Sequence, residues 1–260
     1  MNQRIRLAMF LGALAAAASA RAAIDYTDTW WTPAEGGWGV TLTQQRDTIY
    51  VTFYVYGPDG RPTWYAALLS RDGTAERFVG QLHRTTGTFF GAPWTGFTLA
   101  PAGSATFTAT SSTSGTLTYT AEGSSVTKTI ERITLASLSV AGVYIGGVSG
   151  RRSGCASGSG AFIDPMQFVI QHSTQTGDVR IDQISTATGQ RVCRMEGKAA
   201  QLGRLLTVEG GSYACVDGWT SSVRIDNLRP TSGGFEAQWF ADRGNGCTES
   251  GQLSGVTQFP

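Results

Sequence analysis

The stretch TIYVTFYVY, residues 48–56, alternates strictly between apolar side chains and tyrosine or threonine side chains. A two-residue period is typical of a β-strand with one buried face, because successive side chains of a strand point to opposite sides. A helix would place residues three apart on one face, and here such residues belong to different classes. We therefore expect a strand with an apolar inner face and a tyrosine-rich outer face.

The rest of the chain repeats this pattern of short apolar runs between turn residues. It contains 34 glycines and 8 prolines, and after residue 22 no apolar period of 3.6 residues lasts three turns. Gly57-Pro58-Asp59-Gly60 suits a type I turn, so residues 62–69 are expected to return as a hairpin partner. Further strands are expected at 38–44, 76–83, 105–110, 115–120 and 126–132, and then at 162–171, 179–185, 191–195, 204–208, 213–216, 222–227 and 235–241.

This spacing of strands predicts an all-β protein of two antiparallel meander barrels or sandwiches. The boundary is expected near residues 134–140. It gives an N-terminal β domain over 23–135 and a C-terminal β domain over 140–260. Whether the two arose by duplication stays open.

All four cysteines lie in the second domain: Cys155, Cys193, Cys215 and Cys247. In an exported chain the default interpretation is two disulfides, and no C-x-x-C pair supports a metal site. Three connectivities are possible. We favour Cys193 with Cys215, on neighbouring strands, and Cys155 with Cys247, which would join the two ends of the domain.

The first 22 residues are typical of a secretory signal peptide. Two arginines precede the apolar run LAMFLGALAAAASA, and Ala20-Arg21-Ala22 offers a cleavage site after Ala22 or, alternatively, after Ala20. The run is shorter than the ~20 residues that span a bilayer, and no later segment reaches that length. We therefore expect an exported protein, periplasmic or extracellular, with no membrane span in the mature chain.

The charge of the mature chain argues against a nucleic-acid partner. Loss of residues 1–22 removes three of the twenty basic residues and none of the nineteen acidic ones, which leaves a net charge of about −2. Binding to phosphate backbones requires a clustered excess of positive charge.

Three motifs of the N-terminal half resemble the signature of a family of uncharacterised secreted proteobacterial proteins, W-W-x-P-x-E-x-G-W-G followed by G-x-P-x-W-Y. They are WWTPAEGGWG at residues 30–39, Gln44-Gln45, and GRPTWY at residues 60–65. The resemblance covers residues 26 to about 133. Thr32 and Gly36 depart from it, since the family usually has asparagine and serine there. The resemblance implies an exported β-rich module and supplies no activity, cofactor or catalytic residue.

Glu35, within the first of these motifs, is the one candidate for a catalytic acid. Glycoside hydrolysis commonly uses two carboxylates about 5–10 Å apart, and no second acid stands at a defined spacing from Glu35. We expect Glu35 to accept backbone N–H bonds in a turn and assign no catalytic residue. Trp38 is expected to point into the barrel as core or end plug. Trp30 and Trp31 are adjacent and must point opposite ways, so Trp31 is kept as a candidate for ligand binding.

The outer face of the predicted hairpin is the main candidate site. Tyr50, Tyr54 and Tyr56 share it in any register. A three-residue loop would add Trp64, whereas a four-residue loop would add Tyr65 and Arg61 instead. Such a row offers flat apolar surfaces with hydroxyls at their edges, which suits sugar rings or a partner's surface. The alternatives are cross-strand pairs that only stabilise the sheet and burial against the second domain.

Together these features favour a non-enzymatic binding or surface-interaction protein. The expected partner is a carbohydrate or another envelope protein, without a cofactor or a metal. Two alternatives remain: a glycoside hydrolase-like enzyme that uses Glu35, and an inhibitor of a secreted protease whose site lies in a loop.

Overall fold

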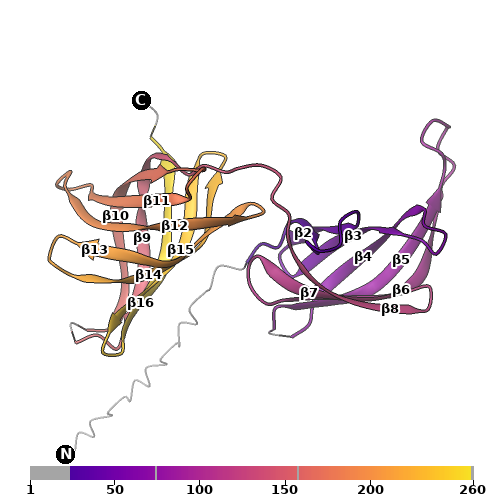
Figure 1. Ribbon diagram of the computed structural model, residues 1–260, viewed down its shortest axis with the longest axis horizontal. Helices are drawn as coiled ribbons and strands as arrows, with labels where there is room; N and C mark the ends of the chain where they lie inside the picture. Colours follow the sequence, from indigo (N-terminus) through magenta and orange to yellow (C-terminus); the bar gives the residue numbers. More distant parts are fainter. Residues whose placement is uncertain (1–23, 74, 157, 259–260) are drawn as a thin grey trace, which may run out of the picture.

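The computed structural model describes residues 24–73, 75–156 and 158–258. In these residues the chain has no helix and forms two closed antiparallel barrels of eight strands each, joined by a linker (Figure 1). In each barrel every strand pairs with the next one in sequence, and the last pairs with the first. The all-β fold class predicted from the sequence is confirmed, and both units are barrels.

The strands are named here in chain order. The first barrel consists of β1 (Asp28–Trp31), β2 (Gly39–Gln45), β3 (Thr48–Tyr56), β4 (Pro62–Arg71), β5 (Arg77–Gly87), β6 (Phe97–Ala109), β7 (Ser114–Ala121) and β8 (Ser124–Arg132). The second consists of β9 (Gly142–Ser153), β10 (Gly160–His172), β11 (Asp178–Ser185), β12 (Arg191–Leu202), β13 (Leu205–Cys215), β14 (Thr220–Thr231), β15 (Gly234–Gly244) and β16 (Cys247–Thr257).

The inner side chains of the first barrel fill it. On β3, Ile49, Val51 and Phe53 are fully buried, as the alternation requires. Aromatic rings from β1, β5 and β6 pack with them at close range, with the rings of Trp30 and Phe107 5.4 Å apart. The barrel interior is therefore a packed core, which leaves the outer surface and the loops as the places where a ligand could bind.

The first barrel closes where β1 pairs with β8, through Trp30 opposite Arg132. Trp30 is completely buried, whereas its neighbour Trp31 points outward and is only partly buried. The strand beside β1 approaches it closely at Gly39, where a Cβ atom would lie 2.9 Å from the carbonyl oxygen of Trp30. Glycine is therefore required at this position for β1 and β2 to meet.

The second barrel has its own apolar core and two disulfides. Cys193 and Cys215 are direct partners across β12 and β13, with Cα atoms 3.9 Å apart. Cys155, just after β9, is bonded to Cys247 at the start of β16, with Cα atoms 4.4 Å apart. These are the two pairs favoured from the sequence, and both lie in the C-terminal domain as expected.

Some strand predictions need correction. Residues 204–208 and 213–216 were expected as two strands but belong to β13, because the two glycines at 210–211 form an irregularity in one strand and not a turn. Strands β1, β9 and β16 are absent from the expected ranges, and β6 begins earlier than expected, at Phe97. The predicted signal peptide lies outside the described residues. Within them, no helix is long and apolar enough to cross a membrane.

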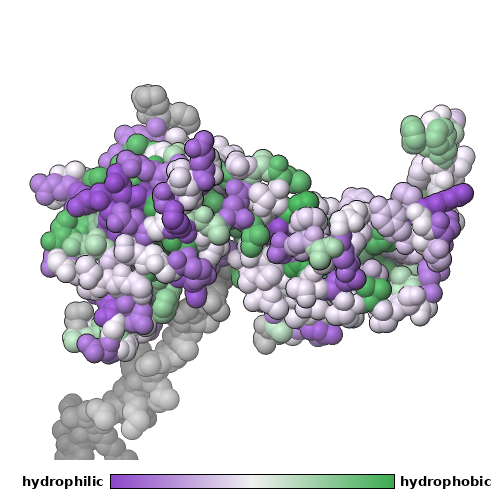
Figure 2. All heavy atoms as spheres, in the orientation of Figure 1, coloured by the Kyte–Doolittle hydropathy of each residue, from purple (hydrophilic) through white to green (hydrophobic). Residues whose placement is uncertain are grey.

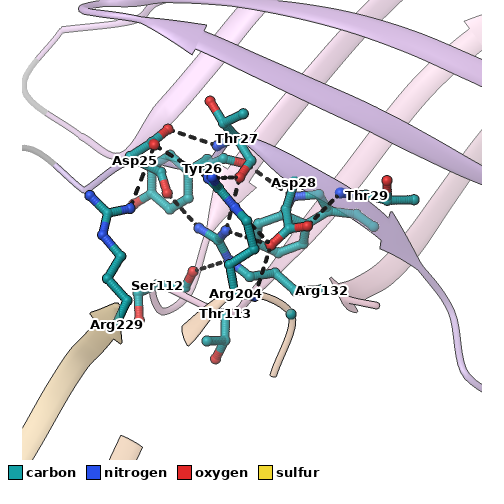
Figure 3. A network of polar contacts seen from close by, with 12 residues as sticks. Asp25, Tyr26, Thr27, Asp28, Thr29, Ser112, Thr113, Arg132, Arg204 and Arg229 are labelled. Carbon is teal, nitrogen blue, oxygen red and sulfur yellow. Dashed lines mark hydrogen bonds and ion pairs between the residues drawn. The ribbon is translucent and has the colours of Figure 1, made fainter. Parts of the chain in front are cut away.

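The two barrels contact each other at the start of β1 (Figure 3). The Asp28 carboxylate accepts a hydrogen bond from the Arg132 guanidinium at 3.0 Å and another from the backbone N–H of Arg204 at 3.2 Å. Arg204 lies in the turn between β12 and β13 and is preceded by Gly203, which has a φ of 61°. A Cβ atom on Gly203 would lie 2.6 Å from an Asp28 carboxylate oxygen, so glycine allows the turn to approach β1.

Candidate functional site

The predicted aromatic row lies on the outside of the first barrel. Tyr50, Tyr54 and Tyr56 of β3 and Trp64 of β4 are each 47–55% exposed. Tyr54 and Trp64 are direct partners across the two strands. Direct partners on one face of an antiparallel pair lie close enough for their side chains to interact, so these four residues share one side of the sheet.

The loop between β3 and β4 decides which residues of β4 join this row. Tyr56 pairs with Pro62, which leaves a five-residue loop closed by a hydrogen bond from the Gly57 N–H to the Arg61 carbonyl at 2.9 Å. Loops of three and of five residues both pair the even-numbered residues of β3 with even-numbered residues of β4. Trp64 therefore faces outward with the tyrosines, as expected for a three-residue loop. The alternative candidate, Tyr65, points inward and is buried.

Trp31 belongs to the same outer face. Gly39 lies beside Trp31 in β1 on one side and is the direct partner of Tyr54 in β3 on the other. Since strands are about 4.8 Å apart, about 9.6 Å separates the backbones of Trp31 and Tyr54, and glycine leaves no side chain between them. The structure thus brings together all five residues predicted for ligand binding, and we call Trp31, Tyr50, Tyr54, Tyr56 and Trp64 the outer aromatic face.

A row of smaller residues crosses the outer aromatic face. Thr41, Thr52, Ala66 and His83 are successive partners on four neighbouring strands, and Thr52 lies between Tyr50 and Tyr54 along β3. Alternate residues of a strand are about 6.8 Å apart, so the rings on either side of this row are about 14 Å apart. His83 was not predicted as part of the site, because its place beside Ala66 depends on the β4–β5 register.

The outer aromatic face also carries hydroxyl groups that are free to form hydrogen bonds with a ligand. In the described part of the chain the phenol hydroxyls of Tyr50, Tyr54 and Tyr56 make no hydrogen bond to another protein group. Leu68, directly opposite Tyr50 and well exposed, extends the apolar area at one end. The face therefore combines flat apolar rings with free hydroxyl groups, which suits a ligand that has both kinds of surface.

The glycine-rich loop between β1 and β2 lies against the other end of the face. Gly37 adopts a φ of 100°, and a Cβ atom there would be 3.1 Å from the Tyr56 hydroxyl oxygen. Substitution of Gly37 would therefore disturb both the loop and the ring of Tyr56. The loop positions the last aromatic residue of the row.

Glu35 lies in this loop, and its carboxylate binds side chains and not the backbone N–H groups that were expected. It accepts hydrogen bonds from Lys128 at 2.8 Å and from the Trp38 indole at 3.1 Å. The bond from Lys128 holds the pKa of the Glu35 carboxyl below its ordinary value. Trp38 is partly buried against the first core, consistent with an end plug.

This environment does not favour Glu35 as the proton donor of a glycoside hydrolase. Such an acid needs a raised pKa so that it holds its proton near neutral pH, and Lys128 has the opposite effect. Among the residues that the structure describes, no cluster of three His, Cys, Asp or Glu side chains is arranged to hold a metal ion.

A second exposed apolar region was not predicted from the sequence. The hairpin of β5 and β6 extends away from both barrels, and its end carries several exposed aromatic residues (Figures 1 and 2). The signal that marks it is the absence of any charged residue or histidine from residue 85 to residue 121. These aromatic side chains are exposed and belong to neither core.

Comparisons with known proteins do not assign a family. No protein-family model and no curated protein matches the chain, so the resemblance to secreted proteobacterial proteins stays a prediction.

Two solved structures have a distant likeness to the chain. One is a double mutant of Transferrin Binding Protein B from Haemophilus parasuis Hp5, with 12% identity and a TM-score of 0.32 over 85% of this chain and 39% of that chain. The other is isotype 1 Transferrin binding protein B from serogroup B Neisseria meningitidis, with 8% identity and a TM-score of 0.35 over 86% of this chain and 66% of that chain. The chain thus spans less than two thirds of either protein, and a likeness with such low TM-scores assigns it neither an activity nor a partner.

Proposed function

We propose that the protein is an exported, non-enzymatic binding protein that uses the outer aromatic face of its first barrel. The observation that carries the proposal is that five tryptophan and tyrosine side chains lie on the outer side of β1, β3 and β4. The four on β3 and β4 are about half exposed. The inner side chains fill the core of the first barrel. Aromatic residues on the outside therefore have a use other than the core.

The preferred ligand is a glycan of the cell envelope. Sugar rings present apolar C–H surfaces and hydroxyl edges, which match aromatic rings and free phenol hydroxyls. The rings lie on both sides of the row through Thr52 and Ala66, so the surface suits an extended ligand that contacts more than one ring. An envelope protein with a flat, mixed surface is the alternative partner.

Export to an oxidising compartment supports this assignment. All four cysteines form disulfides, and disulfides persist outside the cytoplasm. The periplasm and the exterior both fit, and both place the outer aromatic face within reach of envelope glycans.

The proposal is tested with the double variant Tyr54→Ala with Tyr56→Ala on a panel of glycans and envelope extracts. Exposed aromatic contacts at the centre of an interface commonly contribute more than 1 kcal/mol each, so affinity should fall at least about tenfold. Phe240→Ala, which removes a partly exposed aromatic ring from the second barrel, is the matched control and should bind as the wild type does. Unchanged binding of the double variant would show that the outer aromatic face is structural.

Treatment of the extract separates the two ligand classes. Periodate oxidation should destroy a glycan ligand, whereas protease digestion should leave it able to bind. If digestion abolishes binding and periodate does not, the partner is a protein.

A further inference from the structure

Among the residues that the structure describes, the end of the β5–β6 hairpin carries a group of highly exposed aromatic side chains. Phe89, Phe90, Trp94 and Phe97 are between 64% and 96% exposed, and we call these four residues the hairpin tip. Their rings form two pairs, with centroids 4.5 Å apart for Phe89 and Phe90 and 6.4 Å apart for Trp94 and Phe97. Four such side chains expose about 600 Å² of aromatic surface, if each contributes about 200 Å² when fully exposed.

No charged residue accompanies this surface. The run from residue 85 to residue 121 contains no Asp, Glu, Lys, Arg or His, and the residues on its two sides, Arg84 and Glu122, pair with each other at 3.5 Å. A soluble hairpin normally carries charges at its end, because charged side chains keep exposed loops hydrated and separate. A charged side chain would have to lose its hydration to enter an apolar medium, and the hairpin tip has none to desolvate.

The polar groups near the hairpin tip are bonded to one another. The hydroxyls of Thr86 and Thr98 are 2.5 Å apart, and those of Thr88 and Thr95 are 2.8 Å apart. The Thr88 hydroxyl also accepts the backbone N–H of Thr95, and the N–H of Ala92 is bonded to the Phe89 carbonyl at 2.9 Å. These groups would lose few bonds to water in a medium poor in water.

The shape of the hairpin distinguishes a lipid surface from a protein partner. The hairpin tip projects from one two-stranded ribbon (Figure 1), and its ~600 Å² lies below the ~800 Å² that each side of a standard protein interface contributes. A second copy of the chain would offer an equally narrow and convex surface. A lipid bilayer accepts such a shape without a preformed pocket, and tryptophan and phenylalanine favour the boundary between headgroups and acyl chains.

We propose that the hairpin tip inserts into the interface of a lipid membrane, by apolar contact and without attraction to anionic headgroups. This site is distinct from the outer aromatic face, so the protein would hold a membrane surface with one part of its first barrel and a ligand with another. A single hairpin gives reversible attachment and not permanent anchoring.

The test is flotation of the purified exported protein with phosphatidylcholine vesicles and with vesicles that also contain phosphatidylglycerol, at 0.05 M and 0.5 M salt. The protein should bind both compositions with similar affinity at both salt concentrations. Phe90→Ser with Trp94→Ser should weaken binding at least about tenfold, because it removes two of the most exposed apolar side chains. Tyr54→Ser with Tyr56→Ser removes the same number of aromatic residues from the outer aromatic face and should bind vesicles as the wild type does.

A conservative variant tests the geometry without loss of apolar surface. Trp94→Phe should still bind vesicles, but the quenching of tryptophan emission by brominated acyl chains should fall, because Trp94 is the indole placed in the lipid. Vesicle binding that the Phe90 and Trp94 double variant retains would overturn the proposal. So would binding to anionic vesicles alone, no binding to either vesicle, or dimerisation in solution that the same double variant abolishes.

Discussion

Replacement of Arg132 should lower the unfolding free energy of the first barrel by an amount that its buried contacts allow us to estimate. Its side chain is completely buried at the junction of β1 and β8, with the guanidinium 5.0 Å from the ring centre of Trp30. It donates hydrogen bonds to the Ser112 carbonyl at 2.8 Å and to the Asp28 carboxylate at 3.0 Å, and also to the carbonyls of Asp25 and Thr27. Burial lowers the pKa of Arg132, but a guanidinium stays protonated in proteins.

We expect Arg132→Met to destabilise the first barrel by about 3–5 kcal/mol. Methionine keeps most of the apolar volume but leaves the Asp28 carboxylate, whose side chain is 8% exposed, without its buried partner. Asp28 keeps the half-exposed Arg204 guanidinium at 3.6 Å, but the Ser112, Thr27 and Asp25 carbonyls also lose their donor. Loss of one partner of a buried, hydrogen-bonded ion pair typically costs about this amount. For a barrel of about 110 residues it corresponds to a fall in Tm of roughly 12–20 °C.

The assay is equilibrium urea unfolding with thermal melts, fitted separately for the two barrels if their transitions resolve. The matched variant is Arg132→Met with Asp28→Asn, which removes both charges. It should be at least about 1 kcal/mol more stable than the sum of the two single variants predicts. A cost below about 1 kcal/mol for Arg132→Met, or additive effects of the two substitutions, would refute the buried ion pair as the cause.

Two further predictions concern the second barrel. Cys193→Ser with Cys215→Ser should lower the unfolding free energy of the second barrel by about 3 kcal/mol, because the disulfide closes a loop with a sequence separation of 22 residues. Denaturant titration should show this loss in the second barrel and no change in the first. Burial raises the pKa of Tyr213 from its ordinary 10.0 to about 12. Its contribution to stability is therefore fully present below pH 10 and is lost as the pH rises through 12, so unfolding free energies measured over this range should fall less in Tyr213→Phe than in the wild type.

The alternation of side chains predicted most of the strands, because most strands of each barrel have one apolar face. Residues 48–56 form β3 with the bounds expected from the sequence. The prediction failed where inward positions are not apolar. In β16 the inner positions include Gly251 and the buried Glu249, whose carboxylate pairs with Arg152 and Arg243. A buried charge that is neutralised across strands leaves no apolar pattern to detect.

Glycine was the other source of error, because it serves turns and strand irregularities equally well. Gly60, with a φ of 72°, lies in the turn predicted for it, whereas Gly211 lies within β13, where its close approach to the Glu196 carbonyl leaves little room for a Cβ atom. Sequence alone does not distinguish these uses.

The candidate site was predictable along β3 but not across strands. The positions of Tyr50 and Tyr54 on one face follow from the alternation, whereas the contribution of Trp31 depends on closure of the barrel and on Gly39 as a gap between strands. The place of His83 beside Ala66 depends on register. The hairpin tip was not predicted, because a short run that contains phenylalanine is also typical of a buried strand. Its exposure follows only from the three-dimensional structure.

The most direct test of the proposed function is hydroxyl-radical footprinting of the wild-type protein, free and bound to its envelope ligand. If the outer aromatic face is the binding surface, oxidation of Tyr50, Tyr54, Tyr56 and Trp64 should fall on binding, while that of Phe240 on the second barrel stays unchanged. Equal oxidation of these four residues in the free and bound protein, with binding intact, would contradict the account.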